Sequence, residues 1–371
     1  MTRAVLCVVG TRPEAIKMAP VVLRLRASPG FRVRLLATAQ HRQMLDQALA
    51  PFALRPDIDL DLMRPDQSLT DLTARMLMRL GPVLSAEAPD IVLAQGDTTT
   101  VLATALACFH ARIPFGHIEA GLRTGSLDNP FPEELNRVLT AQMARWHFAP
   151  TARAAAPLVA EGRDPASVHV TGNTVIDALR LVAGRAPPLP VAIDPGRRLI
   201  LATLHRRENF GAPLERILVA LSAIVRDNLD TELLIPVHQN PNVHRVIEAR
   251  LAGRDRVRLT GPLGYGEFVA AMLRAHLILS DSGGVQEEAP ALGRPVLVLR
   301  DTTERPEAAD AGATELVGTA TDRIRACAQR LLDDPAAHAR MAAAGSPYGD
   351  GRAAERIAGV LAADDLRAAA A

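Results

Sequence analysis

The chain has 371 residues, which is long for a single hydrophobic core and favours two domains. Its net charge is +1 and aromatic residues make up only 3%, so neither a nucleic-acid surface nor an anionic-membrane surface is indicated. Three cysteines, Cys7, Cys108 and Cys327, lie far apart in apolar sequence, as free thiols of a reducing compartment do. No apolar run reaches membrane-spanning length. We therefore expect a soluble, cytoplasmic, two-domain protein.

The first element is predicted to be a buried strand over residues 4–9, because this run is apolar and β-branched. Residues 10–14, GTRPE, then start a helix with Pro13 in its first turn. Arg12 and Lys17 flank that helix start, and cations beside unpaired helix N–H groups suit an anion such as a phosphate. Neither the P-loop pattern nor the dinucleotide pattern GxGxxG follows the strand.

Lys17 is the only lysine in the chain, and the other 41 basic residues are arginines. Arginine thus occupies every other position that needs only positive charge. A lone exception indicates a place where a compact ammonium is required and a planar guanidinium does not serve. The alternative is a neutral surface position at which lysine persists by chance.

Acidic residues follow two further predicted strands and open a helix. A strand at 31–38 and a helix at 69–84 come first; then a strand at 91–94 leads to Asp97, and a strand at 114–118 leads to Glu119. A loop delivers Glu133 and Glu134 to the start of another helix. Ligands of parallel α/β sheets bind at the carboxyl ends of the strands, so Asp97, Glu119 and Glu133 are expected to converge. The alternative is that Asp97 caps the helix at 98–111 and Glu133 merely stabilises a helix start.

The order of elements predicts a fold of two similar halves. Strands at 146–148 and 168–171 and a helix from 172–174 complete a strict alternation, which favours a doubly wound parallel sheet over residues 1–182. Residues 183–197 are rich in proline and form the expected linker. A second domain is predicted at 198–350, with strands at 199–203, 231–237, 275–279 and 295–299, followed by a helical tail at 351–371.

Polar residues also follow the strands of the second half. The candidates are His205, Arg206, Arg207, Ser282, Gly283, Gly284 and Arg305. The twin glycines allow a ligand to approach the backbone, and a helix expected from Val285 directs its amino end there. Glu287 and Glu288 lie within reach of a ribose diol. This set suits a diphosphate in a cleft between the domains, whereas the histidines lack the spacing of metal ligands.

Nine motifs in this order resemble the non-hydrolysing UDP-N-acetylglucosamine 2-epimerase family. They are GTRPEAIKMAP at 10–20, TAQHRQMLD at 38–46, QGDTTT at 95–100, HIEAGLRT at 117–124, FPEELNR at 131–137, TGNTVID at 171–177, LHRRENFG at 204–211, DSGGVQEEA at 281–289 and TTERPE at 302–307. The resemblance implies a GT-B fold, which has two Rossmann-like domains facing across a cleft and a terminal helix that crosses back to the first domain.

The resemblance further implies the reaction and its residues. UDP-GlcNAc and UDP-ManNAc would interconvert by anti elimination of UDP to 2-acetamidoglucal and readdition, with no cofactor and no metal. The catalytic positions fall on Lys17, Asp97, Glu119, Glu133 and His205. The UDP-binding positions fall on Arg12, His205, Ser282, Gly283, Gly284, Glu288 and Arg305. A homodimer and a part in cell-surface polysaccharide biosynthesis are also implied, whereas partners such as nucleic acid or membrane are not.

Other functions remain open at this point. Some members of the family act on UDP-sugars that carry a 3-acetamido group and a uronate, and the sequence does not distinguish such a substrate. A GT-B glycosyltransferase would share the nucleotide site but would need an acceptor groove. A hydrolysing epimerase, sometimes fused to a kinase, and a non-catalytic sugar-nucleotide sensor are further alternatives; a sensor would need no acids at C2.

A second UDP-GlcNAc site, through which substrate activates the enzyme, is also implied by the resemblance. Its positions fall on Gln40, Gln43, Glu133, Arg207 and His238. One further position, typically arginine in the family, is Asp66 here, and a carboxylate repels a diphosphate that a guanidinium would hold. Arg64 lies nearby, but Pro65 restricts how the loop can turn it inward. We therefore expect weakened or absent activation.

Overall fold

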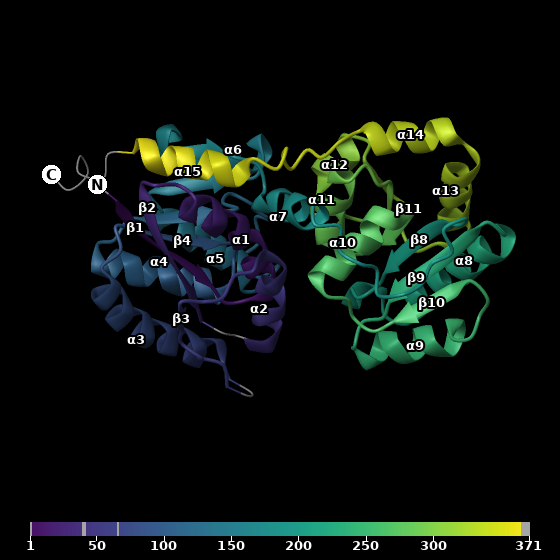
Figure 1. Ribbon diagram of the computed structural model, residues 1–371, viewed down its shortest axis with the longest axis horizontal. Helices are drawn as coiled ribbons and strands as arrows, with labels where there is room; N and C mark the ends of the chain where they lie inside the picture. Colours follow the sequence, from purple (N-terminus) through teal and green to yellow (C-terminus); the bar gives the residue numbers. More distant parts are fainter. Residues whose placement is uncertain (1, 39–41, 65–66, 365–371) are drawn as a thin grey trace. The chain divides into compact units, whose positions relative to one another are not determined.

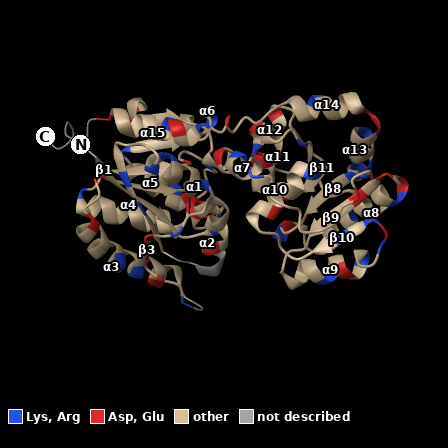
Figure 2. Ribbon diagram, in the orientation of Figure 1, with Lys and Arg blue, Asp and Glu red and all other residues tan. Residues whose placement is uncertain are grey.

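The structure, a computed structural model, describes residues 2–38, 42–64 and 67–364 (Figure 1). The chain divides into two compact units. Unit 1 comprises Met1–Leu181 and Tyr348–Ala371, and unit 2 comprises Val182–Pro347. Acidic and basic residues are interspersed along the ribbon of both units (Figure 2). Among the described residues, no helix is both long and apolar enough to cross a membrane.

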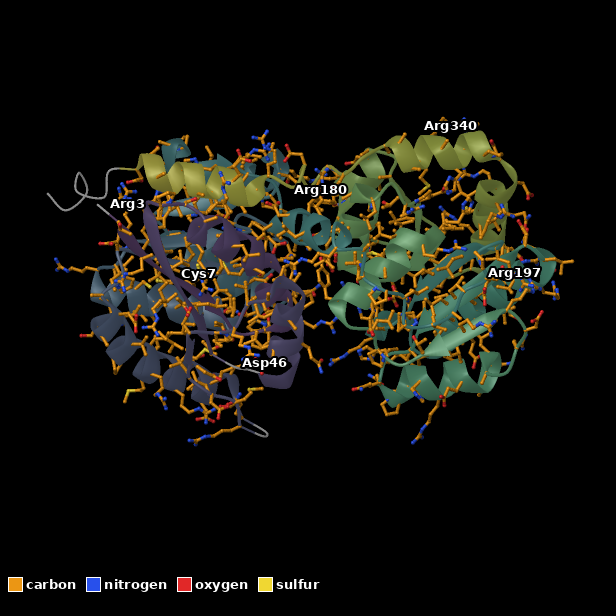
Figure 3. The ribbon with its side chains drawn as sticks, viewed as in Figure 1. Arg3, Cys7, Asp46, Arg180, Arg197 and Arg340 are labelled. Carbon is orange, nitrogen blue, oxygen red and sulfur yellow. The ribbon has the colours of Figure 1, made fainter. Side chains whose placement is uncertain are left out.

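Unit 1 is built on a seven-stranded parallel sheet. Its order is β3 (Ile58–Asp59), β2 (Phe31–Ala37), β1 (Arg3–Val9), β4 (Ile91–Gln95), β5 (Phe115–Ile118), β6 (Trp146–Ala149) and β7 (Val168–Val170). In β1, an inner strand, Cys7 (labelled in Figure 3) lies in register with Leu35 of β2 on one side and Leu93 of β4 on the other. Such a strand is covered on both faces, which is why residues 4–9 are continuously apolar.

Helices cover both faces of this sheet. They are α1 (Arg12–Arg26), α2 (Arg42–Leu49), α3 (Leu69–Glu87), α4 (Thr99–Ala111), α5 (Glu133–Met143), α6 (Ala152–Ala160), α7 (Thr174–Ala183) and α15 (Ala353–Ala363), with short 3-10 turns at Ala50–Phe52 and Pro165–Ser167. On one face α3 packs on α4, and α4 on α5. Elsewhere α1 packs against α2 and α15, so the last described helix belongs to the same unit as the first strand.

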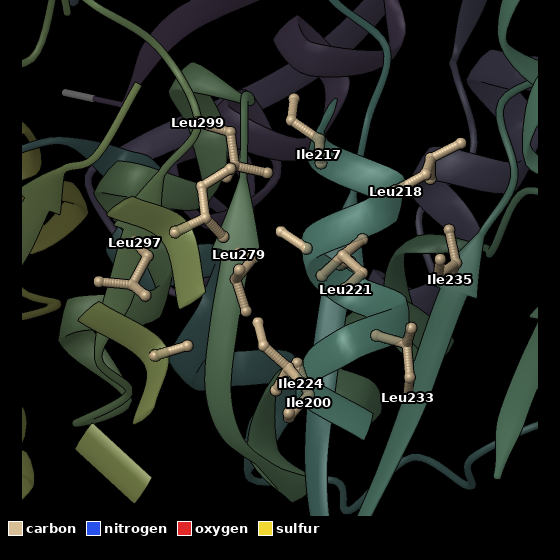
Figure 4. Close-up of a cluster of buried hydrophobic side chains, with 14 of the residues drawn as sticks. Ile200, Ile217, Leu218, Leu221, Ile224, Leu233, Ile235, Leu279, Leu297 and Leu299 are labelled. Carbon is tan, nitrogen blue, oxygen red and sulfur yellow. The ribbon is translucent and has the colours of Figure 1, made fainter. Parts of the chain in front are cut away.

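Unit 2 repeats the plan with six parallel strands. Their order is β10 (Val257–Thr260), β9 (Thr231–Pro236), β8 (Arg198–Thr203), β11 (Ala275–Ser280), β12 (Val296–Val298) and β13 (Thr314–Leu316). The helices are α8 (Ala212–Asp227), α9 (Pro241–Leu251), α10 (Tyr265–Arg274), α11 (Gly283–Ala291), α12 (Pro306–Asp310), α13 (Thr321–Asp333) and α14 (Pro335–Ala343), with a 3-10 turn at Arg207–Asn209. Leu221 and Ile224 of α8 lie in one core cluster with Ile200 and Leu279 of the sheet (Figure 4).

The predicted pair of doubly wound parallel sheets is confirmed; the differences concern the ends of elements and short strands, such as β3 and β13, that were not predicted. The helix expected from Val285 begins two residues earlier, at Gly283, because Ser282 has the extended backbone of an N-cap. The helix expected at 69–84 continues to Glu87. Residues 184–197 form no helix or strand, and within unit 2 the Asp194 N–H donates to Glu232 at 3.0 Å.

Candidate active site

The carboxyl edge of the unit 1 sheet gathers the acidic residues that the sequence singled out. Asp97 follows β4, Glu119 follows β5, and Glu133 is the first residue of α5. The pKa of Asp97 responds to the charges of Lys17, Glu119 and Glu133, so these groups share one neighbourhood. The predicted convergence of the three carboxylates therefore holds at this edge.

Lys17 and Glu119 form a close ion pair at this edge. The Lys17 Nζ lies 2.6 Å and 2.7 Å from the two carboxylate oxygens of Glu119. Gln95 donates to the same carboxylate, and Asn173 Nδ2 donates to it at 3.0 Å. The Glu119 side chain is only 6% exposed. Lys17, Gln95 and Asn173 thus all donate to this one carboxylate.

The backbone at Glu119 is unusual for a residue with a side chain. Its φ is +62°, a left-handed conformation that costs about 1–3 kcal/mol in a non-glycine residue. Gly121 follows at φ +92°, and a Cβ there would lie 1.9 Å from the Ala154 carbonyl oxygen, so only glycine fits. The turn after β5 thus directs the Glu119 carboxylate toward Lys17 at a conformational cost.

Asp97 belongs to a second network, centred on the buried Arg137. One guanidinium nitrogen of Arg137 lies 2.7 Å from Asp97 Oδ2, and another lies 2.7 Å from Glu134 Oε2. Asn136 Nδ2 donates to the Asp97 carbonyl oxygen at 2.7 Å. The capping alternative for Asp97 is wrong, because the N-cap of α4 is Thr98 and the Asp97 side chain binds Arg137 instead.

The two carboxylates that share Arg137 have pKa values shifted in opposite directions. Partial burial raises the pKa of Asp97 above its ordinary value; Arg137 opposes this, and the Glu119 charge adds to it. Burial also acts to raise the pKa of Glu134, but hydrogen bonds from Arg137, Gly125 and Thr124 outweigh it, and the net shift is downward. Asp97 is therefore the carboxyl of this pair that more readily holds a proton.

The turn after β1 is fixed by another buried carboxylate. Glu14 accepts from the N–H groups of Gly10 at 2.5 Å and Thr11 at 2.9 Å, and the Thr98 hydroxyl donates to its other oxygen. Burial raises the pKa of Glu14, and these three hydrogen bonds oppose the shift. Glu14 thereby ties the helix start that carries Arg12 and Lys17 to the residue next to Asp97.

His117 of β5 supports the turn that follows β4. Its Nε2 lies 2.7 Å from the Gly96 carbonyl oxygen, and burial lowers its pKa to about 4. The ring is therefore neutral near pH 7, and an Nε2–H tautomer donates to Gly96. This interaction fixes the backbone one residue before Asp97.

In unit 2, His205 is held by a fully buried aspartate. The Asp281 carboxylate accepts from the N–H groups of His205 and Arg206 at 3.0 Å and from Asn209 Nδ2 at 3.1 Å. His205 Nδ1 lies 3.2 Å from Asp281 Oδ1. Burial lowers the pKa of His205 and Asp281 opposes the shift, so Nδ1–H faces the carboxylate and orients the ring.

The start of α11 has backbone groups that an anion could bind in unit 2. Ser282 is its N-cap, and Gly283 and Gly284 open the helix, whose first N–H groups lack intrahelical acceptors. A Cβ on Gly283 would lie 3.4 Å from the guanidinium of Arg206. The Arg206 guanidinium therefore lies beside the first backbone N–H groups of α11, an arrangement that suits an anion.

Two glutamates of α11 are already engaged by side chains of unit 2. The Tyr265 hydroxyl donates to the buried Glu288 at 2.9 Å, and Arg305 donates to Glu287. Arg305 is itself fixed by its N–H, which donates to the Thr303 hydroxyl at 3.0 Å. Within the described ranges, no group of three or more His, Cys, Asp or Glu side chains could hold a metal ion.

The residues expected at a second nucleotide site are only partly described. Gln40 and Asp66 lie outside the described residues, and Gln43 lies in α2. Arg207 begins the 3-10 turn after β8. The His238 ring stacks on His205 with centroids 5.9 Å apart, and its Nδ1 accepts from the Asn240 N–H at 3.1 Å.

Several residues that build these arrangements were not predicted as site residues. They are Glu14, Gln95, Glu134, Arg137, Asn173 and Asp281, although all of them lie in the motifs that carry the family resemblance. Chemically, unit 1 offers a proton-holding carboxyl beside a lysine–glutamate pair, which suits proton transfer at a weakly acidic carbon. Unit 2 offers backbone donors, arginines and an oriented histidine, which suit a diphosphate.

Comparisons with known proteins agree along almost the whole chain. A sequence model described as UDP-N-acetylglucosamine 2-epimerase matches residues 23–362. The UDP-N-acetylglucosamine 2-epimerase of Yersinia pestis is 51% identical over 363 residues, covering 95% of this chain and 96% of that protein.

Solved structures of similar proteins extend the agreement to the fold. The UDP-GlcNAc 2-epimerase of Neisseria meningitidis, bound to UDP-GlcNAc, is 45% identical with a TM-score of 0.88 over 97% of this chain and 100% of that one. The enzyme of Methanocaldococcus jannaschii, in complex with UDP-GlcNAc and UDP, is 31% identical with a TM-score of 0.78 over 97% and 100%. The predicted GT-B fold class is thereby confirmed.

Proposed function

The chain belongs to the UDP-N-acetylglucosamine 2-epimerase family, and on that premise we propose that it interconverts UDP-GlcNAc and UDP-ManNAc. A base removes the C2 proton as the bond from C1 to the UDP oxygen breaks, in an anti elimination that leaves 2-acetamidoglucal and UDP. UDP then adds back to C1, and a proton returns to the opposite face of C2. The relatives from Neisseria meningitidis and Methanocaldococcus jannaschii bind UDP-GlcNAc, which supports this substrate.

We assign the proton transfers to the carboxylates of unit 1. The observation that carries the assignment is the environment of Asp97, whose pKa is raised mainly by burial and lies closer to the working range of a proton carrier. Glu133 contributes negative charge to the same neighbourhood. Glu119 acts as the anchor of Lys17, whose ammonium stabilises negative charge that develops on the substrate.

We assign the UDP group to unit 2. The N–H groups at the start of α11 and the guanidinium groups of Arg206 and Arg305 suit the departing diphosphate. Glu288, held by Tyr265, suits the ribose hydroxyls. His205, held with Nδ1–H toward Asp281, can donate from Nε2 to a phosphate oxygen once the ring takes up a second proton as the imidazolium.

An exchange experiment in heavy water tests this function. Purified protein incubated with UDP-GlcNAc in D₂O should yield both UDP-HexNAc epimers with deuterium at C2, followed by ¹H NMR and mass spectrometry. Release of free ManNAc, or epimers without deuterium, would contradict the elimination route. A UDP-glycosyltransferase would leave UDP-GlcNAc undeuterated, and an enzyme for a 3-acetamido uronate would be inert with UDP-GlcNAc but active with that sugar.

We propose that substrate activation is weak or absent, since Asp66 stands where the family typically has arginine. Coupling energies between sites are typically about 1–3 kcal/mol, so the loss of one cation is enough to remove the effect. The reverse reaction provides the test: UDP-ManNAc alone should be converted. If it is inert until trace UDP-GlcNAc is added, the second site works and this proposal is wrong.

We also propose a cytoplasmic homodimer that supplies sugar nucleotides for cell-surface polysaccharides. Free thiols at Cys7, Cys108 and Cys327 support a reducing compartment. Exposed apolar side chains on the packed helices α4 and α5, namely Phe109, Leu135 and Leu139, support pairing with a second copy through this surface. Light scattering coupled to size exclusion should give twice the mass of 39.6 kDa, and a monomer would contradict the proposal.

A further inference from the structure

Asn173 links the catalytic edge of unit 1 to two distant parts of the chain. Its Nδ2 donates to the Glu119 carboxylate at 3.0 Å, and its Oδ1 accepts from the Val175 N–H at 3.1 Å, in the first turn of α7. Its own N–H donates to the Tyr348 carbonyl oxygen at 2.6 Å. The side chain is buried. Because one end of the amide faces an N–H and the other a carboxylate, its orientation is determined.

We propose that Asn173 is a positioning residue that holds Glu119 against Lys17. It also connects this pair to the two segments through which the chain leaves unit 1 and returns to it. One segment is α7, which carries the chain from Leu181 into unit 2. The other begins at Tyr348, where the chain returns to unit 1. The inference rests on the proposed function, since it assigns a role in positioning that site.

The two segments are fastened to each other within unit 1. A Cβ on Gly172 would lie 3.3 Å from the Gly349 Cα, so the backbones touch where side chains are absent. The Asp177 carboxylate accepts from the N–H groups of Ala353 and Ala354, at 3.1 Å and 2.8 Å, and so caps α15. These contacts join the two segments into a single packed junction.

A second glycine confirms how tightly this junction is packed. A Cβ on Gly351 would lie 2.4 Å from the Cδ of Arg180, which extends from α7 (Figure 3). The backbone there is left-handed, with φ +76°. Asn173 lies at the start of the same α7, so any rotation of this junction is transmitted through its amide to Glu119.

Glu119 needs such support because its own backbone is strained. A left-handed φ at a residue with a side chain persists only where the surroundings enforce it. Gln95 at the end of β4 and Asn173 directly before α7 approach the carboxylate from two different parts of the chain. Charged or titratable groups near Glu119 include Lys17, Asp97 and His117. Loss of the Asn173 donor frees the carboxylate to turn away from Lys17.

Two substitutions separate the donor from the shape of the side chain. Asn173→Asp keeps an acceptor for the Val175 N–H but places a carboxylate against Glu119, so turnover should fall further than in Asn173→Ala. For Asn173→Ala we expect kcat to fall by about 10- to 100-fold, the scale of a misplaced catalytic group. UDP affinity, measured by calorimetry, should change less than about twofold because the UDP group is assigned to residues of unit 2. A kcat within twofold of wild type in both variants would overturn the proposal.

Asn228 provides the matched control. It is also buried, and its Nδ2 donates to the Ile224 carbonyl oxygen at 2.8 Å and to Gln329 at 3.0 Å, far from any proposed site residue in sequence. Asn228→Ala should lower the melting temperature as Asn173→Ala does, but should leave kcat unchanged. An equal loss of kcat in both variants would mean that Asn173 acts only through general stability.

The single lysine gives a test that does not depend on turnover. In protein labelled with ¹³C,¹⁵N-lysine, and carrying no lysine in any tag, Lys17 supplies the only lysine side-chain signals. In both Asn173 variants these signals should move and the ammonium protons should exchange several-fold faster with water, whereas Asn228→Ala should leave them in place. If the wild type lacks epimerase activity, the proposed function fails, but unchanged Lys17 signals alone would refute the role of Asn173.

Discussion

The carboxyl edges of the two sheets differ in chemistry although the sheets share one strand order. In unit 1 the ion pairs are buried: the Arg137 side chain is 8% exposed and its partner Glu134 is 2% exposed. In unit 2, Arg305 also pairs with a buried carboxylate, Glu287, but Glu304, which faces Arg206 and Arg300, is 52% exposed. The same scaffold thus holds Arg137 in a buried pair in unit 1 and leaves Arg206 and Arg300 of unit 2 beside a half-exposed carboxylate that they can exchange.

This difference matches the two tasks that the proposed reaction requires. Buried pairs cannot exchange partners with solvent, so they hold catalytic groups in one geometry before substrate arrives. Half-exposed pairs gain little stability, so an arginine can leave a glutamate for an incoming diphosphate at small cost. Fold alone does not decide between these behaviours, because the loops after the strands supply the charged groups.

The largest expected effect comes from breaking the central pair of unit 1. Arg137→Met should lower the free energy of unfolding by about 3–5 kcal/mol, because Glu134 is left buried without its cation. Urea unfolding followed by circular dichroism would measure it. Arg226→Met is the control, since its pair with Asp227 lies on the surface. Equal stability of the two variants would show that burial does not distinguish the pairs.

The next effect concerns the three carboxylates of unit 1. Asp97→Asn, Glu119→Gln and Glu133→Gln should each lower turnover by at least ~100-fold, the usual scale of a general acid or base or of its charged support. UDP binding should largely survive, since the UDP group is assigned to unit 2. Steady-state kinetics and calorimetry provide both quantities. If any two variants keep near-full turnover, the assignment of the carboxylates is wrong.

Substitution of Lys17 tests the shape of the cation separately from its charge. Lys17→Arg should fail nearly as badly as Lys17→Ala, because a planar guanidinium cannot take the place of an ammonium 2.6 Å and 2.7 Å from both Glu119 oxygens. The measurement is kcat for both variants under one set of conditions. Full activity of the arginine variant would make the lone lysine incidental.

Acid should destabilise the protein through His117, which burial keeps neutral with a pKa of about 4. In the unfolded chain this imidazole binds a proton near pH 6.5. The stability that neutral His117 contributes is therefore fully present above pH 6.5 and is lost as the pH falls toward 4. The loss from this residue is about 2 kcal/mol by pH 5. Urea titrations from pH 7 to 5 should show a smaller fall in His117→Gln, and parallel curves would contradict this origin.

The smallest effect is expected in unit 2. Glu304→Gln removes a carboxylate that is 52% exposed and lies 3.5 Å from Arg300, so the free energy of unfolding should change by no more than ~0.5 kcal/mol. Turnover should stay near wild type. A loss comparable to that of Arg137→Met would mean that the exposed pairs are as fixed as the buried ones.

The sequence was sufficient for the fold class and for the residues at strand ends. Apolar runs that end in Asp97, Glu119 or Ser282 mark buried strands and the edge at which ligands bind, and both signals are local. Two- and three-residue strands such as β3 and β13 carry no periodic pattern and were not predicted. The start of α11 was misplaced by two residues because an extended Ser282 cannot be distinguished from a loop residue by composition.

The supporting residues were not predictable because their roles arise from contacts between distant segments. Gln95 and Asn173 reach Glu119 from positions 24 and 54 residues away, and Arg137 reaches Asp97 across 40 residues. An amide or a guanidinium in a motif looks the same whether it contacts substrate or another side chain. Only the folded arrangement identifies which acids are held by neighbours and which one has a raised pKa.

The return of the chain to unit 1 fixes the order in which the protein can be completed during synthesis. Arg3, at the start of β1, donates to the carbonyl oxygens of Leu361 and Asp364, and the Asp364 carboxylate accepts from Trp146 Nε1 at 2.7 Å. Unit 2 is one continuous stretch, so all of it has been translated before these partners exist. Unit 1 therefore begins first but is completed only after unit 2 has been translated, and the surface of α1 that α15 covers stays exposed until then.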